Sequence, residues 1–203
     1  KKKNLFTKNF QLFEIFISKK PDFQIISSEF GNTYLHKTID VDMNSAKNSE
    51  ERFTNSLLNE MSEDDIQFVI NHKNKNEETP LHLAVEKENL EICDFLIKRG
   101  ADINAKNIDK RTPLHFAVIN ERYDICDLLI KIKKEKGENI DDLDKNEETP
   151  LHLAVVKGIL KMCKFLIKRG AKIDAKNIEG STPLHIAVEK ENLEICDFLI
   201  KIK

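Results

Sequence analysis

Apolar residues along the chain follow a helical period in short segments, and polar or glycine-containing stretches separate these segments. Residues 90–98 carry one broad apolar face made of Ile92, Cys93, Phe95, Leu96 and Ile97. Leu81 and Ala84 lie three residues apart, so a helix places both on one face, where the small alanine lets a second helix approach closely. The pattern predicts pairs of short antiparallel helices.

The same pattern repeats along the chain. The segment T-P-L-H begins at Thr79, Thr112, Thr149 and Thr182, which are 33, 37 and 33 residues apart. Residues 85–98 also return letter for letter as residues 188–201. A single helix pair cannot bury its own apolar faces, so such units must stack, each contacting only its neighbours.

Each repeat contains signals for the start and end of its helices. The threonine side chain can accept a hydrogen bond from an early backbone N–H, and the proline that follows is suited to the first helical turn. Gly100, Gly137 and Gly170 stand where the second helices should end, because glycine adopts the left-handed conformation required there at least cost. An extended finger, such as residues 101–105, then leads to the next unit.

A repeat of 33 residues with T-P-L-H-x-A at the start of its first helix resembles the ankyrin repeat. The resemblance implies an all-α ankyrin-repeat solenoid of stacked helix-turn-helix units with β-turn fingers. We predict four clear repeats, over residues 74–106, 107–143, 144–176 and 177–203. The last helix duplicates an internal one and lacks a polar outer face, so we expect that face to be bare and the array to continue beyond Lys203.

Two departures from a regular repeat have structural consequences. The spacing of 37 residues comes from about four extra residues near 132–135, which should lengthen the second helix or its exit loop. The glycine usual between the two helices in ankyrin repeats is present as Gly158, but Glu88, Glu121 and Glu191 take its place in the other repeats. We expect the turn to form at these positions in a less favourable conformation.

Residues 1–73 carry weaker signals, and we interpret them as degenerate N-terminal ankyrin-like repeats or a cap, with a polar loop near residues 42–50. Thr33-Tyr34-Leu35-His36 looks like a worn T-P-L-H. Two further helices are predicted over residues 51–60 and 64–71, the second with a Ser62-x-x-Asp65 start signal. A helix over residues 5–18, with Phe10, Phe13 and Phe16, should pack on the first stacked helices.

Composition excludes several classes of protein. The net charge is −2 and the isoelectric point is near 6.4, so nothing indicates a nucleic-acid-binding surface. No segment approaches the roughly 18 to 20 apolar residues that a membrane span needs, and no signal-peptide pattern opens the chain. The six glycines form no phosphate-binding loop, so we expect no cofactor and no small-molecule substrate.

Four cysteines and six histidines could suggest a metal site or a nucleophile, but their register argues against both. Cys93, Cys126, Cys163 and Cys196 share one repeat position, and a histidine recurs at another. Equivalent positions of stacked helices lie about 8 to 10 Å apart, too far for a shared zinc ion or a disulfide. We predict that every cysteine is a small buried core residue and that each histidine ties one finger to the next.

Acidic residues are numerous but form runs such as residues 138–142, which we interpret as solvated turns rather than acid–base pairs. No calcium-binding loop is present. The sequence therefore predicts that the chain is not an enzyme.

The resemblance implies that a partner protein binds along the concave groove formed by the finger tips and the first helices. Ile119 and Val156 stand where the flanking repeats place Glu86 and Glu189, and an apolar centre ringed by charge is typical of a binding patch. Scattered surface apolar residues are the alternative interpretation. The candidate protein-binding residues are Ile108, Arg111, Ile119, Tyr123, Val156, Lys157, Ile178 and Lys190.

Two functions remain as hypotheses. The first is a protein–protein interaction module that binds another protein, in a chain whose Lys-, Asn- and Ile-rich composition suggests a host-directed protein of an intracellular microbe or virus. The second is a targeting or substrate-recruiting segment of a larger enzyme or toxin. Buried free thiols favour a reducing, cytoplasmic location, which includes the cytoplasm of a host cell.

Overall fold

The computed structural model describes residues 32–41, 59 and 61–202. Within these ranges every regular element is a helix. Contacts divide the chain into two units, one made of the described residues up to 87 together with 91–102, the other of residues 88–90 and the chain from 103 onward. The helix predicted over residues 5–18, the loop near 42–50 and, apart from Asn59, the helix over 51–60 lie outside the described residues.

The first unit contains α2 (Tyr34–Val41), α4 (Glu63–Ile70), α5 (Pro80–Glu86) and most of α6 (Leu90–Lys98). Helix α2 packs against α4 and α5, and the core is formed by buried residues such as Leu35, Ile39, Val69 and Leu81. The predicted start signal of α4 is confirmed, because the Ser62 hydroxyl accepts a hydrogen bond from the Asp65 N–H (3.2 Å). The helix itself begins one residue earlier than predicted.

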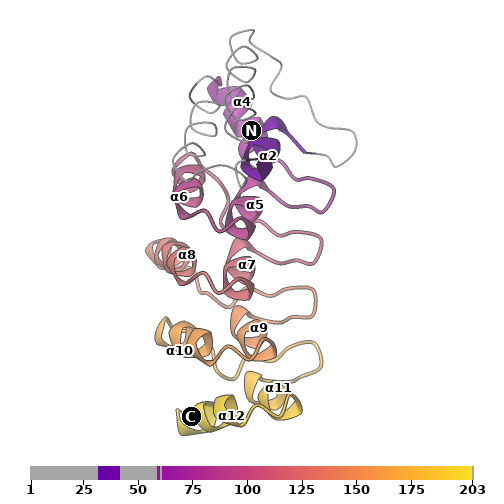
Figure 1. Cartoon of the computed structure of the whole chain (residues 1–203), viewed down its shortest axis with the longest axis vertical. Coiled ribbons are helices and arrows are strands. Elements are labelled where there is room, and N and C mark those ends of the chain that lie inside the picture. The colour runs from indigo at the N-terminus through magenta and orange to yellow at the C-terminus, as the bar shows by residue number, and fades with distance from the viewer. Residues whose placement is uncertain (1–31, 42–58, 60, 203) are drawn as a thin grey trace, which may run out of the picture. The chain divides into compact units, whose positions relative to one another are not determined.

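The second unit contains three helix pairs (Figure 1). These are α7 (Pro113–Ile119) with α8 (Tyr123–Glu135), α9 (Pro150–Val156) with α10 (Leu160–Lys168), and α11 (Pro183–Glu189) with α12 (Leu193–Lys201). Helix α9 packs against both α7 and α11, and α10 packs against α12. Each pair therefore buries its apolar faces against the neighbouring pairs, as a stacked repeat requires.

The first helices begin as the T-P-L-H motif predicts, with one addition. At α9, Pro150 is the first helical residue and the Thr149 hydroxyl accepts the His152 N–H (3.4 Å). The His152 ring returns the interaction, because its Nδ1 accepts the Thr149 N–H (3.1 Å). Histidine thus takes the part of the glutamate or glutamine in a capping box, and the same reciprocal arrangement starts α5, α7 and α11.

The second helices α6, α8 and α10 end in the predicted left-handed glycine. Gly170 has φ +97°, and the next N–H, of Ala171, donates back to the Leu166 carbonyl (3.0 Å). This closes a Schellman motif and satisfies carbonyls that the helix leaves open. Helix α8 ends in the same way at Gly137, but it has 13 residues where α6, α10 and α12 have 9. The extra residues therefore lengthen the second helix, which confirms one of the two predicted outcomes.

The turns between paired helices place glutamate in the left-handed region. Glu88, Glu121 and Glu191 have φ of 60°, 55° and 53°, close to the 72° of Gly158 at the equivalent position. A residue with a β carbon is disfavoured there by roughly 1–2 kcal/mol. The prediction of a less favourable turn at these three positions is confirmed.

This turn supplies a reciprocal test. We expect Glu121→Gly to raise the free energy of unfolding by about 0.5–1 kcal/mol, because the strained backbone is relieved while the exposed side chain is lost at little cost. Gly158→Ala should lower it by about 1 kcal/mol, because alanine is strained at the φ of +72° that this glycine adopts. Urea denaturation measures both variants. Shifts of the same sign in the two proteins would contradict this explanation of the turns.

Candidate protein-binding surface

Each finger is folded by one side chain at its base. The Asn107 Oδ1 accepts the backbone N–H groups of Asp109 (3.0 Å) and Arg111 (2.9 Å). Asn74, Asp144 and Asn177 do the same for their fingers. Asn and Asp favour such turns because their short side chains mimic a backbone carbonyl. The fingers are therefore fixed turns rather than loose connections.

Neighbouring fingers of the second unit are also joined through their backbones. The Lys145 N–H donates to the Asp109 carbonyl (2.8 Å), and the Ile178 N–H donates to the Asn146 carbonyl (2.9 Å). An ion pair reinforces the first of these backbone hydrogen bonds, because the Lys145 ammonium lies 2.7 Å from Asp109 Oδ1. This hydrogen bond from Lys145 holds the pKa of the Asp109 carboxyl below its ordinary value.

The motif histidines connect the helix starts to the fingers of the next repeat. Nε2 of His36 lies 3.1 Å from the Glu78 carbonyl, Nε2 of His115 lies 3.3 Å from that of Glu148, and Nε2 of His152 lies 3.1 Å from that of Ser181. Since Nδ1 accepts the threonine N–H, Nε2 carries the proton and donates it to the carbonyl. The prediction that each histidine ties one finger to the next is confirmed at these three positions.

Burial keeps these histidines neutral. It lowers the pKa of His36 and of His115 to about 4, although a hydrogen bond to a backbone carbonyl acts in the opposite direction in each case. Burial also lowers the pKa of His152. A charged imidazole would have to give up the hydrogen bond that Nδ1 accepts, so the neutral ring is the form that the repeat uses.

The cysteines lie on the second helices, where three of the four are buried. Burial raises the pKa of the Cys126 and Cys163 thiols to about 12, so neither forms the thiolate that a nucleophile requires. Cys196 corrects the prediction of four buried cysteines, because it is only half-buried on α12, where no further helix pair packs in the described part of the chain. In that part no cluster of three or more His, Cys, Asp or Glu side chains could hold a metal ion.

The predicted apolar binding residues differ in exposure. Ile108 and Ile178, at the finger tips, are 63% and 65% exposed, and Val156, at the end of α9, is 40% exposed. Ile119, its equivalent at the end of α7, is half-buried. Lys157 and Lys190 are exposed at the first residues after α9 and α11. Thus, both isoleucine tips and the end of α9 offer apolar surface to solvent, while Ile119 offers less than predicted.

Arg111 and Tyr123 make contacts that the sequence did not indicate. Nε of Arg111 lies 3.5 Å from Oδ2 of Asp144, a fully buried side chain at the base of the next finger. The Tyr123 ring instead packs edge-on against Phe165 of α10, with ring centres 5.5 Å apart. Arg111 therefore belongs to the fingers, as predicted. The contact between the Tyr123 and Phe165 rings instead lies between the two second helices α8 and α10.

Lys133, in the lengthened part of α8, was missed by sequence reasoning. Its side chain is among the largest that are fully buried, with 1% of the residue exposed. The ammonium lies 2.9 Å from the Asp142 carboxylate and 3.7 Å from that of Glu138, and it donates to the Asn104 side-chain oxygen. Residues 138–142 are therefore not a simple solvated turn as predicted, because two of their acids surround a buried cation.

A signal for this cluster is present in the sequence. Glu138 and Asp142 stand where the fingers of the neighbouring repeats have small alanines, namely Ala101, Ala105, Ala171 and Ala175. The two acids occur only in the repeat that also carries the inserted residues. Two acids that replace alanines in the same repeat as an inserted lysine indicate a charge pair. The reason is that a lysine buried without an acidic partner would be costly in free energy.

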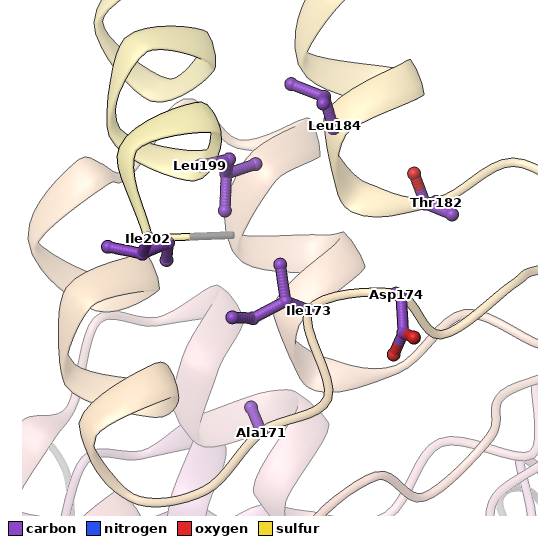
Figure 2. Close-up of a pocket in the computed structure, with 7 residues that line it drawn as sticks. All are labelled: Ala171, Ile173, Asp174, Thr182, Leu184, Leu199 and Ile202. Atoms are coloured by element: carbon purple, nitrogen blue, oxygen red, sulfur yellow. The ribbon is translucent and has the colours of Figure 1, made fainter.

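The last helix pair has an exposed apolar face, as expected. Leu193 is 80% exposed, and Val188 and Ile200 are also exposed. A pocket of about 300 Å³ opens on this face, between the finger residues Ala171, Ile173 and Asp174, the start of α11 and the end of α12 (Figure 2). Its lining residues Ile173 and Leu184 are half-buried, whereas their equivalents in the preceding repeat, Ile140 and Leu151, are buried. The pocket is therefore lined by residues at positions that the next repeat covers elsewhere in the chain.

Comparison with known proteins agrees with this architecture. A family model described as ankyrin repeats (3 copies) matches residues 5–107, 42–138 and 132–203. The chain belongs to the ankyrin-repeat family, whose members generally act as protein–protein interaction modules and are typically not catalytic. No curated protein matches the sequence. In the described residues, no helix is both long enough and apolar enough to cross a membrane.

The buried lysine gives a prediction for stability. Lys133→Met should lower the free energy of unfolding by about 3–5 kcal/mol, because it leaves the Asp142 carboxylate without its buried partner. Adding Asp142→Ala and Glu138→Ala, the residues that neighbouring repeats carry, should recover most of the loss. Urea denaturation of the single and triple variants tests this. A triple variant no more stable than the single one would refute the charge-pair explanation.

The hydrogen bonds from the motif histidines to the carbonyls of the next finger, here called the histidine bridges, make stability depend on pH. The unfolded histidines titrate near pH 6.5 and the folded His36 and His115 near 4, so the unfolded chain binds more protons between these values. The stabilisation is complete above about pH 6.5 and is lost as the pH falls toward 4. We expect a loss of up to about 1.4 kcal/mol per histidine for each pH unit in this window.

Urea denaturation between about pH 7 and pH 5 measures this loss. His115→Gln, which removes one titrating ring, should make the dependence shallower. Its free energy of unfolding is compared with that of His185→Gln, a change at an exposed ring of the last repeat. An unfolding free energy independent of pH in the unmodified chain would show that the bridges do not need neutral histidine.

Proposed function

We propose that the chain binds a partner protein through a binding strip formed by Ile108, Ile119, Val156 and Ile178. The observation that carries the proposal is the exposure of large apolar side chains on fingers that hydrogen bonds hold in place. Exposed apolar groups on a rigid support bind with a small loss of conformational entropy. The family supports the same conclusion, since ankyrin repeats generally bind proteins.

Charge around the strip supports this assignment. Lys157 is exposed beside Val156 at the end of α9, and Lys190 is exposed beside Glu189 at the end of α11. Lys145 stands between the two isoleucine tips in sequence register. Arg111 and Asp144 neutralise one another at the base of the fingers. An apolar centre with a charged rim is the arrangement in which a few central residues dominate binding energy and the rim adds mainly specificity.

The partner and the compartment belong to the same proposal. Free thiols on all four cysteines support a reducing, cytoplasmic location. The Lys-, Asn- and Ile-rich composition supports a partner in the host cell of an intracellular microbe or virus. Pull-down with the chain as bait, followed by mass spectrometry, identifies the partner.

The binding strip is tested by two substitutions made together. Ile119→Glu with Val156→Glu introduces the residue that the flanking repeats carry at this position, so the fold should stay intact. Binding to the captured partner should weaken by about 2 kcal/mol or more, roughly thirtyfold. Titration calorimetry measures the affinity, and a thermal melt checks the fold.

The control is Leu193→Glu with Ile200→Glu, which adds the same charge at exposed apolar positions of α12, outside the strip. These changes should leave the affinity unaltered. Unchanged affinity of the strip variant, with an intact melt, would move the binding site elsewhere on the chain.

A further inference from the structure

The exposed face of α10 carries three lysines, Lys161, Lys164 and Lys168. Their spacing of three and four residues places the side chains in one row along the helix. With a rise of 1.5 Å per residue, the row extends about 10 Å. Figure 1 shows the second helices α8, α10 and α12 on the side away from the fingers, so this lysine row is separate from the binding strip.

The other second helices have acids at the first two of these positions. The triplets are Glu91, Asp94 and Lys98 in α6, Asp124, Asp127 and Lys131 in α8, and Glu194, Asp197 and Lys201 in α12. In α6 and α12 the aspartate pairs with the lysine one turn later, at 2.5 Å and 3.4 Å. Helix α10 alone has reversed the charge of both acidic positions.

The reversal removes the ion pair between the second and third positions, and in exchange the structure gives Lys164 a cation–π contact with Phe198. Lys168 follows Lys164 by four residues, a like-charge arrangement that slightly destabilises a helix. In the part of the chain that the structure describes, none of the three ammonium groups lies within ion-pair distance of a carboxylate. Lys164 lies over the Phe198 ring of α12, 5.4 Å from its centre. Since the equivalent helices have acids at the first two positions, helix stability does not explain Lys161 and Lys164.

Acids border the lysine row on both sides. Helix α8 packs beside α10 through Tyr123 and Phe165, and its Asp124 and Asp127 are already paired with Arg122 and Arg169. Helix α12 packs on the other side and presents Glu194 and the exposed Asp197. A flat anionic surface or a nucleic-acid duplex would bring its phosphates against the exposed carboxylates of α12 as well. A narrow acidic segment can lie on α10 alone.

We propose that the lysine row of α10 is a docking site for an acidic segment of a partner protein. The row matches a helix with glutamates at i, i+3 and i+7, which repeats the spacing of the lysines. Such exposed charge pairs contribute mainly to the rate of encounter and to specificity, and binding should weaken as salt rises. The site adds a second surface to the chain and does not depend on the binding strip.

The test uses a synthetic, dye-labelled helical peptide with glutamates at i, i+3 and i+7, and the same peptide with glutamines. Fluorescence anisotropy at low salt should show binding of the glutamate peptide only. Lys161→Glu with Lys164→Asp, the acids of α6 and α12, should weaken binding at least tenfold, while Lys161→Arg with Lys164→Arg should retain it. A thermal melt checks that each variant is folded.

The charge-matched control is Lys134→Glu with Lys136→Glu, two exposed lysines at the end of α8. This control should bind the glutamate peptide nearly as well as the unmodified chain. Equal losses in the control and the α10 variant would show that net charge, not the lysine row, attracts the peptide, and would overturn the proposal. So would α10-dependent sedimentation with phosphatidylserine vesicles in the absence of peptide binding, which would assign the row to a lipid surface.

Discussion

The structure depends on a neutral histidine that makes two hydrogen bonds in opposite directions. In His152, Nδ1 accepts the N–H that opens its own helix, and Nε2 donates to the Ser181 carbonyl in the finger of the next repeat. One ring therefore couples the start of a helix to the position of the following finger. Because burial lowers the histidine pKa, the coupling holds at neutral pH without a charge in the core.

This coupling explains why function can lie on the fingers. The positions that build the repeat, namely the threonine, proline, leucine and histidine of the motif, are largely buried and repeat almost unchanged. The tip position is free of these constraints and varies, being Lys75, Ile108, Lys145 and Ile178 in successive repeats. A rigid support with variable tips separates stability from recognition, so a partner can be selected without altering the fold.

The fold and the role of each motif residue could be predicted because they follow from local rules and from register. The histidine bridge, the left-handed glycines and the longer α8 all came from comparing equivalent positions. The burial of Lys133 could not be predicted from the lysine itself, since it lies in an insertion without an equivalent. Only the acids Glu138 and Asp142, at positions where neighbouring repeats have alanine, indicate it. The contact of Tyr123 with Phe165 also depends on how two helices pack, which the residue pattern does not specify.

The candidate site was predictable only in part, for a related reason. Exposed tips follow from the repeat, and Ile108 and Ile178 are indeed exposed. The depth of a residue at the end of a first helix depends on its neighbours, and Ile119 is more buried than Val156 although both occupy one register position.

The most direct test of this account is nitrogen-15 NMR of the imidazole rings at neutral pH. It reports directly which ring nitrogen carries the proton. We predict that His115 and His152 are neutral with the proton on Nε2, hydrogen-bonded to the carbonyls of Glu148 and Ser181. Rings protonated on Nδ1, or exchanging between the two tautomers, would contradict the coupling on which the fold and the placement of the fingers depend.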